Sequence, residues 1–197
     1  MPTVERILLI VNRAAGTGYS RDTAERLRDL LTDAVGERAT LQVEIVDDHP
    51  AARICASRFL AASNTPALII AGGGGGTLRA VIEGICEGSA VGHLPGPERV
   101  RLGALRMGSG NVLAQQFGVP PNAEAGLRGI ITNLHANRTV PCCVVRLERL
   151  RAMPRFTTRR RSEALGSSVA FPETYPVGTA DGRICIERQQ DSSVLKI

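Results

Sequence analysis

Short apolar runs alternate along the chain with longer segments whose apolar residues recur at helical spacing. The first run, Arg6–Val11, is continuous and rich in branched residues, so it predicts a strand that is buried on both faces. A helix is predicted between Ser20, which can cap it, and Gly36, because apolar residues recur there every three or four positions. The same patterns predict further strands at Leu41–Val46, Ala67–Ala71, Val100–Leu105 and Arg138–Leu147, and further helices at Ala51–Ala62, Thr77–Cys86, Asn111–Phe117 and 122–134.

This alternation predicts an α/β fold with an open, mostly parallel sheet and helices on both faces, because parallel neighbours need crossover connections. The carboxyl ends of parallel strands lie at one edge of such a sheet. The loops after the first, third and fourth predicted strands can therefore meet in one crevice. All three loops contain glycine.

Five consecutive glycines, residues 72–76, follow the predicted strand that ends at Ala71. Without Cβ atoms, the backbone N–H groups of such a segment can surround an anion at a helix N-terminus, and phosphate is the expected ligand. A flexible loop or a tight strand-to-helix turn is the alternative interpretation. The spacing Gly-x-Gly-x-x-Gly is absent from all three glycine loops, which disfavours an NAD-dependent dehydrogenase of the usual kind.

Hydroxyl and amide side chains accompany the glycines in these loops. Each of them taken alone is more typical of a helix cap, but their joint placement at three strand ends favours the binding of phosphate, ribose or base. The groups are Asn12 with Gly16 in the first loop, Thr77 in the second, and Ser109, Gly110 and Asn111 in the third.

The composition limits the classes of protein that fit these elements. A chain of 197 residues, 43% hydrophobic and 22% charged, predicts one globular domain with a tail and excludes wholesale disorder, a collagen and a coiled coil. Lys196 is the only lysine, which excludes a Walker phosphate loop. Five cysteines without a Cys-x-x-Cys pair and three histidines indicate neither a disulfide framework nor a zinc site. The early apolar run is too short for a signal peptide or a membrane span, so a soluble intracellular protein is expected.

Most of the net charge of +5 lies after residue 140, where arginines gather between Arg146 and Arg161. A basic segment of this kind can bind nucleic acid or anionic lipid. Aromatic residues make up only 3% of the chain, so stacking surfaces for bases are scarce and no nucleic-acid partner is expected. A solvated, partly disordered tail is the simpler interpretation.

Three motifs in this order resemble the diacylglycerol kinase catalytic domain family, which includes bacterial lipid kinases, the sphingosine kinases and, more distantly, the NAD kinases. Ile7–Asn12 with Gly16 is similar to the family's first strand and its Asn-Pro-x-x-Gly loop. Ile69–Leu78 is similar to the signature Gly-Gly-Asp-Gly-Thr, and Leu102–Ala114 with Phe117–Pro120 to the third signature of the lipid kinase branch. The resemblance covers about residues 6–147.

The resemblance implies an ATP-dependent phosphotransferase that acts on a diacylglycerol or sphingoid type of lipid hydroxyl, with ATP and Mg²⁺ as cofactors. It implies a cytoplasmic protein whose partners are a nucleotide and a lipid at a membrane surface; peripheral attachment to the membrane and a homo-oligomer stay open. The residues that it assigns to nucleotide binding are Asn12, Gly16, Gly73, Gly74, Gly75, Gly76, Thr77, Ser109, Gly110 and Asn111.

The sequence also departs from the family's pattern. Gly75 stands where the signature has an aspartate that is implicated in magnesium handling or in activating the acceptor hydroxyl. Arg13 replaces a proline of the first loop, and Arg79 and Ala80 replace an amide and an acid of the following helix. No catalytic residue and no metal ligand are therefore assigned. A nucleotide-binding module without catalytic turnover is the alternative function.

The expected domain organisation is a nucleotide-binding α/β domain over residues 1–147, followed by an Arg-rich divergent or partly disordered tail over residues 148–197. The family has a second, β-rich domain that closes over the lipid. About fifty residues follow Leu147, and they carry no pattern of alternating strands, so this second domain is expected to be missing or vestigial.

Overall fold

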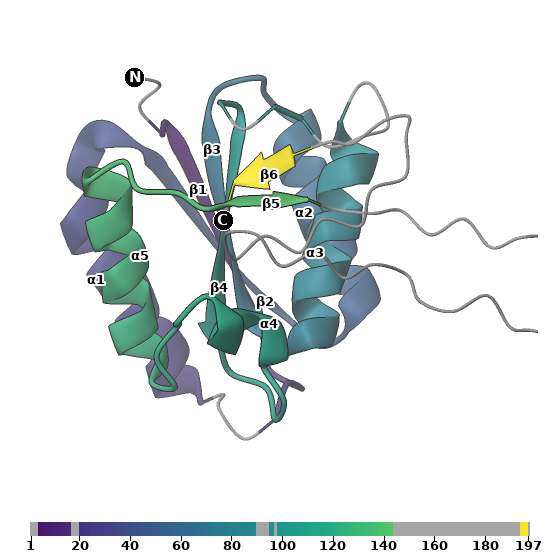
Figure 1. Cartoon of the computed structure of the whole chain (residues 1–197), viewed down its shortest axis with the longest axis vertical. Helices are drawn as coiled ribbons and strands as arrows, with labels where there is room; N and C mark the ends of the chain where they lie inside the picture. The colour runs from purple at the N-terminus through teal and green to yellow at the C-terminus, as the bar shows by residue number, and fades with distance from the viewer. Residues whose placement is uncertain (1–3, 17–19, 90–94, 97, 144–193, 197) are drawn as a thin grey trace, which may run out of the picture. The chain divides into compact units, whose positions relative to one another are not determined.

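The computed structural model describes residues 4–16, 20–89, 95–96, 98–143 and 194–196, and these belong to one compact unit (Figure 1). Its centre is a six-stranded sheet with the strand order β2-β1-β3-β4-β6-β5. Four long strands run parallel, and this confirms the predicted α/β fold. They are β1 (Arg6–Asn12), β2 (Thr40–Val46), β3 (Ala67–Gly73) and β4 (Val100–Arg106).

Two short strands extend the sheet beyond β4. β6 (Val194–Lys196) pairs parallel with β4, and β5 (Pro141–Cys143) pairs antiparallel with β6. The sequence pattern assigns residues 194–196 to the tail, whereas the structure places them in the sheet. The pattern does not show this strand because three residues are too few for a periodicity. The predicted boundary at residue 147 and the remainder of the Arg-rich tail lie outside the described residues.

Helices cover both faces of the sheet, as the sequence predicts (Figure 1). α1 (Arg21–Val35) and α5 (Ala123–His135) pack on one face, where Leu9, Leu27 and Leu127 are fully buried. α2 (His49–Ala61) and α3 (Gly75–Gly88) cover the other face. A 3₁₀ turn at Gly36–Arg38 follows α1, and the short helix α4 (Val112–Gln116) follows β4. None of the described helices is both long enough and apolar enough to cross a membrane.

Local signals place both ends of α1 as predicted. The Ser20 hydroxyl accepts a hydrogen bond of 3.0 Å from the Thr23 N–H at the start of α1, and Gly36 ends this helix at a φ of 54°. The glycine run forms the tight strand-to-helix turn that is one of the alternative interpretations, and not a flexible loop. Gly72 and Gly73 continue β3 and pair with β4, while Gly75 already begins α3. The run is therefore a tight strand-to-helix turn, and Gly74 is the residue at its centre.

The start of α2 is held beside the start of α3 because the two helices touch along a line of small residues. A Cβ atom on Gly84 would lie 2.9 Å from the Ala56 Cβ and closer still to the Arg53 carbonyl oxygen, and one on Gly88 would meet the backbone of Ser57. Because Gly84 and Gly88 have no side chains, the backbones of α2 and α3 can approach each other closely.

At its other end, α2 is fastened to the amino edge of the sheet by arginines. Arg6 donates to the carbonyl oxygens of Phe59 and Ser63, and its guanidinium lies 4.1 Å from the Phe59 ring centre. Arg99 donates to the Leu60 carbonyl oxygen over 3.4 Å. Burial, together with the neighbouring Arg99, lowers the pKa of Arg6 below its usual value. Cations at a helix C-terminus are favourable because they face its unpaired carbonyl groups.

We expect Gly84→Ala to lower the free energy of unfolding by about 1–3 kcal/mol, because the new methyl group must push α2 and α3 apart. Gly129→Ala in α5 is the matched control: a Cβ atom there has no neighbour within 4 Å. Since alanine favours a helix over glycine, the control should gain up to about 1 kcal/mol. Urea denaturation measures both variants, and equal stability of the two would contradict the close packing of α2 on α3.

Candidate functional site

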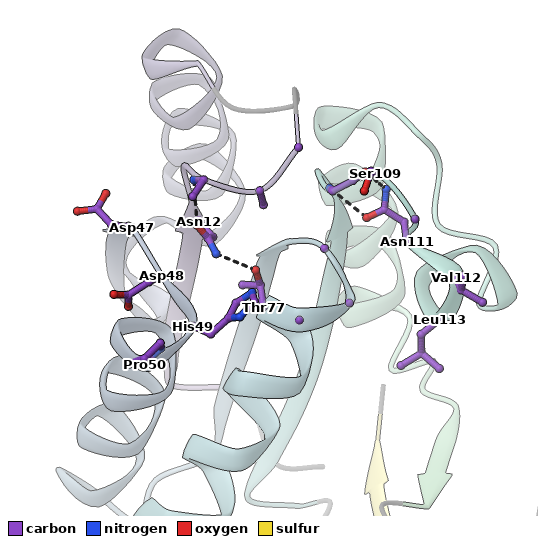
Figure 2. A pocket seen from close by; sticks show the side chains of 18 of the residues that line it. Asn12, Asp47, Asp48, His49, Pro50, Thr77, Ser109, Asn111, Val112 and Leu113 are labelled. Atoms are coloured by element: carbon purple, nitrogen blue, oxygen red, sulfur yellow. Dashed lines mark hydrogen bonds between the residues drawn. The ribbon is translucent and has the colours of Figure 1, made fainter.

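A cleft of about 790 Å³ opens at the carboxyl edge of the parallel strands (Figure 2). The loops after β1, β3 and β4 line it, as the sequence predicts, and the loop after β2 adds a fourth wall. The lining consists of Asn12, Ala14, Ala15, Gly16, Asp47, Asp48, His49, Pro50, Gly74, Gly75, Gly76, Thr77, Gly108, Ser109, Gly110, Asn111, Val112, Leu113 and Gln116. Nine of the ten predicted nucleotide-binding residues are in this list. Gly73 is not, since the space beside its Cα is filled by the Thr77 side chain.

The turn between β3 and α3 presents main-chain groups to the cleft. Gly74 occupies the N-cap position with no side-chain cap, and Gly75 and Gly76 form the first turn of α3. The first N–H groups of a helix have no partner within the helix, and the helix dipole adds partial positive charge at this end. An anionic group such as a phosphate fits this position.

The three glycine turns lie against one another without intervening side chains. A Cβ atom on Gly108 would come within 2.9 Å of the Gly74 nitrogen and would overlap the Gly74 Cα. Gly16 has a φ of 60°, and a Cβ atom there would lie 3.0 Å from the Met107 carbonyl oxygen. Gly108 is thus a site residue that sequence reasoning missed, although it directly precedes the predicted site residues Ser109, Gly110 and Asn111.

A buried hydrogen bond connects the first turn with the second. Asn12 Nδ2 donates to Thr77 Oγ1 over 3.0 Å, and the two residues are 2% and 0% exposed (Figure 2). Asn12 Oδ1 accepts from the Ala14 N–H over 3.0 Å. Both side chains are therefore occupied in shaping the cleft floor.

Asn111 closes the third turn in a similar way. Its φ of 50° is left-handed, its Oδ1 accepts from the Gly108 N–H over 3.1 Å, and its Nδ2 donates to the Gly108 carbonyl oxygen. The turn is further held by Gln115 Nε2, which donates to the Gly110 carbonyl oxygen over 2.7 Å. This places Ser109 and Gly110 at the exposed tip of the turn, on the wall of the cleft.

The loop from β2 to α2 brings Asp47, Asp48, His49 and Pro50 to the cleft, and sequence reasoning missed all four. A signal was present, because β2 is also a parallel strand and ends at the same edge. Asp47 forms an ion pair with Arg13, and Asp48 Oδ1 caps α2 by accepting from the Ala51 N–H over 2.7 Å. The carboxylates of Asp47 and Asp48 point away from Thr77, whereas the His49 ring points toward it (Figure 2).

The lining fits a nucleotide better than it fits a protein-held metal ion. Among the described lining residues the carboxylates are Asp47 and Asp48, and both are engaged, with Arg13 and with the Ala51 N–H. Over the described ranges, no group of three or more His, Cys, Asp or Glu side chains is placed to hold a metal ion. Glu83 and Glu87, on α3, pair with Arg79 and Arg53 and do not line the cleft.

Gly75 differs from its neighbours in having free space. A Cβ atom at this position has nothing within 4 Å, so a side chain could be accommodated where the related signature has aspartate. A Cβ atom on Gly76, in contrast, would meet the His49 ring at 2.5 Å from Cε1 and 2.6 Å from Nε2.

A family model for the diacylglycerol kinase catalytic domain matches residues 6–143. Among solved structures, a diacylglycerol kinase from Bacillus anthracis str. Sterne matches with 22% identity and a TM-score of 0.51, covering 66% of this chain and 44% of that one. Two further structures from the same organism have the same identity and TM-score, with 42% and 39% of their chains covered. The chain spans less than half the length of these structures, and the likeness to them shows the fold. No curated protein matches the sequence significantly.

We expect Thr77→Val to lower the free energy of unfolding by about 1–3 kcal/mol. Valine keeps the volume of threonine but leaves Asn12 Nδ2 without an acceptor in a buried position. Thr77→Ser retains the hydroxyl and is the matched control, with a smaller expected loss. Urea denaturation compares the three proteins. If Thr77→Val were as stable as the unmodified protein, the Asn12–Thr77 bond would not be what holds the two turns together.

Proposed function

This chain belongs to the diacylglycerol kinase catalytic domain family, and on that premise we propose that its cleft binds ATP and that the protein is an ATP-dependent phosphotransferase acting on a lipid hydroxyl. A diacylglycerol or sphingoid type of acceptor fits the family. The proposal sets this reaction at the cytoplasmic surface of a membrane, where such an acceptor is found, with the protein attached peripherally.

The observation that carries the proposal is the meeting of three glycine turns around the N-terminus of α3, at the mouth of one cleft. Phosphate recognition there rests on the main-chain N–H groups of Gly75, Gly76 and Thr77, which have no partner within the helix. The cleft volume of about 790 Å³ is in the range of small-molecule and cofactor sites.

The rim of the cleft also offers apolar surface. Val112 and Leu113, at the start of α4, are 65% and 37% exposed although both are large and hydrophobic. Apolar side chains beside a polar phosphate site suit a ligand with both kinds of surface, such as a nucleotide base or the apolar part of a lipid.

In the proposed reaction the acceptor hydroxyl oxygen forms a bond to the γ-phosphorus of ATP, the bond from that phosphorus to the β,γ-bridging oxygen breaks, and the hydroxyl proton is released. Catalysis of such a transfer consists mainly of positioning and of neutralising the phosphate charge. The turn at Gly74–Thr77 positions the phosphates. Bound with ATP, Mg²⁺ would neutralise phosphate charge, but the described lining has no carboxylate directed at the glycine turn to hold the ion.

That lack of a carboxylate favours the alternative function, a nucleotide-binding module without turnover. A general base and a metal ligand each contribute substantially to phosphoryl transfer. Both functions share the binding of nucleotide in the cleft and differ in whether lipid phosphate is formed.

We expect ATP or ADP with magnesium to raise the melting temperature, since a ligand that binds only the folded state stabilises it. At a hundred times the dissociation constant the gain is about 2.7 kcal/mol, or a shift of about 5–10 °C. Gly74→Val should abolish the shift by filling the space between Gly74 and Gly108. Gly129→Val in α5 is the control and should keep it. Absence of a shift in the unmodified protein at millimolar nucleotide would refute the proposal.

We expect Gly75→Asp to increase the formation of lipid phosphate and to make nucleotide binding more dependent on magnesium. The side chain has room, and its charge repels free phosphate but can bind the metal ion of the nucleotide complex. Gly75→Asn has the same shape without the charge and is the matched control. Transfer from radiolabelled ATP to mixed diacylglycerol and sphingoid lipids measures the activity.

Weak activity of the unmodified protein, increased by Gly75→Asp but not by Gly75→Asn, would support both the kinase function and the view that a carboxylate is missing at this position. Nucleotide binding without lipid phosphate from any of these proteins would favour the binding module. Strong activity of the unmodified protein that Gly75→Asp leaves unchanged or lowers would show that another group takes the part of the aspartate.

A further inference from the structure

His49 is the first residue of α2 and lies against the first turn of α3. Its Cε1 and Nε2 atoms occupy the space that a side chain at position 76 would need, at 2.5 and 2.6 Å from the place of a Cβ atom. The residue is exposed and lines the cleft, so a ligand at the α3 N-terminus can reach the ring. The ring is directed toward Thr77 (Figure 2).

Among the described residues, few positive side chains lie at the cleft. None of those that line it is lysine or arginine, and His49 is the one among them whose side chain can carry a positive charge. Three arginines on the neighbouring elements have carboxylate partners: Arg13 with Asp47, Arg53 with Glu87 and Arg79 with Glu83. A nucleotide polyphosphate carries several negative charges, so a donor beside its binding position has a large effect there.

We propose that His49 is a phosphate-recognising residue of this cleft, whose imidazole N–H donates to the nucleotide phosphate bound at Gly75 and Gly76; the inference rests on the proposed nucleotide site. Gly76 contributes to this arrangement in two ways. It exposes its own N–H group to the phosphate, and its lack of a side chain lets the His49 ring lie next to that group. Two donors from elements that are far apart in sequence then converge on one anion.

The test is the affinity of the full chain for ADP, AMP and adenosine in the presence of magnesium, measured by isothermal titration calorimetry. His49→Ala should weaken ADP binding about tenfold or more, because a charge-assisted hydrogen bond to phosphate is lost. Adenosine has no phosphate, and its affinity should change less than about twofold. His49→Gln keeps an N–H donor, and its affinity for ADP should lie between those of the unmodified protein and His49→Ala.

His135→Ala is the matched control, since His135 is the last residue of α5 and does not line the cleft. It should leave all three affinities unchanged. Gly76→Ala adds a methyl group where the His49 ring lies, so it should weaken ADP binding as well. If it acts by displacing the ring, the double variant His49→Ala with Gly76→Ala should bind ADP no more weakly than the weaker of the two single variants.

The outcomes separate this inference from the proposed function. ADP affinity that is unchanged in both His49→Ala and His49→Gln would overturn the inference and leave the nucleotide site intact. An equal loss for ADP and adenosine would show that His49 only supports the walls of the cleft, and would also overturn it. Failure of the unmodified protein to bind any of the three ligands would refute the nucleotide site itself.

Discussion

The candidate site depends on the close approach of the turns that follow β1, β3 and β4. Gly74 and Gly108 lie so near each other that a Cβ atom on Gly108 would overlap the Gly74 backbone, and one on Gly16 would lie 3.0 Å from the Met107 carbonyl oxygen. With side chains excluded, the floor of the cleft is made of main-chain groups. The Asn12–Thr77 hydrogen bond holds the first two turns together in a place where water does not reach the side chains.

The described lining of this cleft offers main-chain N–H groups and few charged side chains. Within the described part of the chain, the lining carboxylates Asp47 and Asp48 are engaged with Arg13 and with the first turn of α2, and no lysine or arginine lines the cleft. In the proposed complex, the negative charge of the polyphosphate would be balanced by the α3 N-terminus, by His49 and by a cation that arrives with the nucleotide. This distribution of charge differs from that of the family signature, which has an aspartate at the position of Gly75.

The packing of α2 on α3 couples the core to the cleft. Gly84 and Gly88 let the helix backbones touch, and this sets the start of α2 next to the start of α3. His49 reaches Gly76 only because of that contact. Arg6 and Arg99 hold the far end of α2 at the opposite edge of the sheet. Residues well away from the cleft thus decide which side chain stands beside the glycine turn.

Local sequence determined most of the elements. The apolar run of β1, the Ser20 cap and the glycines after β3 and β4 act through neighbouring residues, so their pattern predicted strands, a helix start and turns that can bind an anion. The family resemblance also rests on local sequence, since its motifs are short and continuous. The family-model match to residues 6–143 confirms the resemblance. The place of Asn12, Thr77 and Ser109 at one edge follows from parallel strands alone.

Tertiary structure alone decided how these pieces meet. The sequence cannot show that Gly72 and Gly73 belong to β3 while Gly75 begins α3, because the division is made by pairing with β4. It cannot show that Asp47 to Pro50 line the cleft or that Val194–Lys196 join the sheet, since both depend on the strand order across the whole domain. Periodicity reports which face of an element is buried, whereas contacts such as His49 on Gly76 depend on the distance between elements, which packing sets.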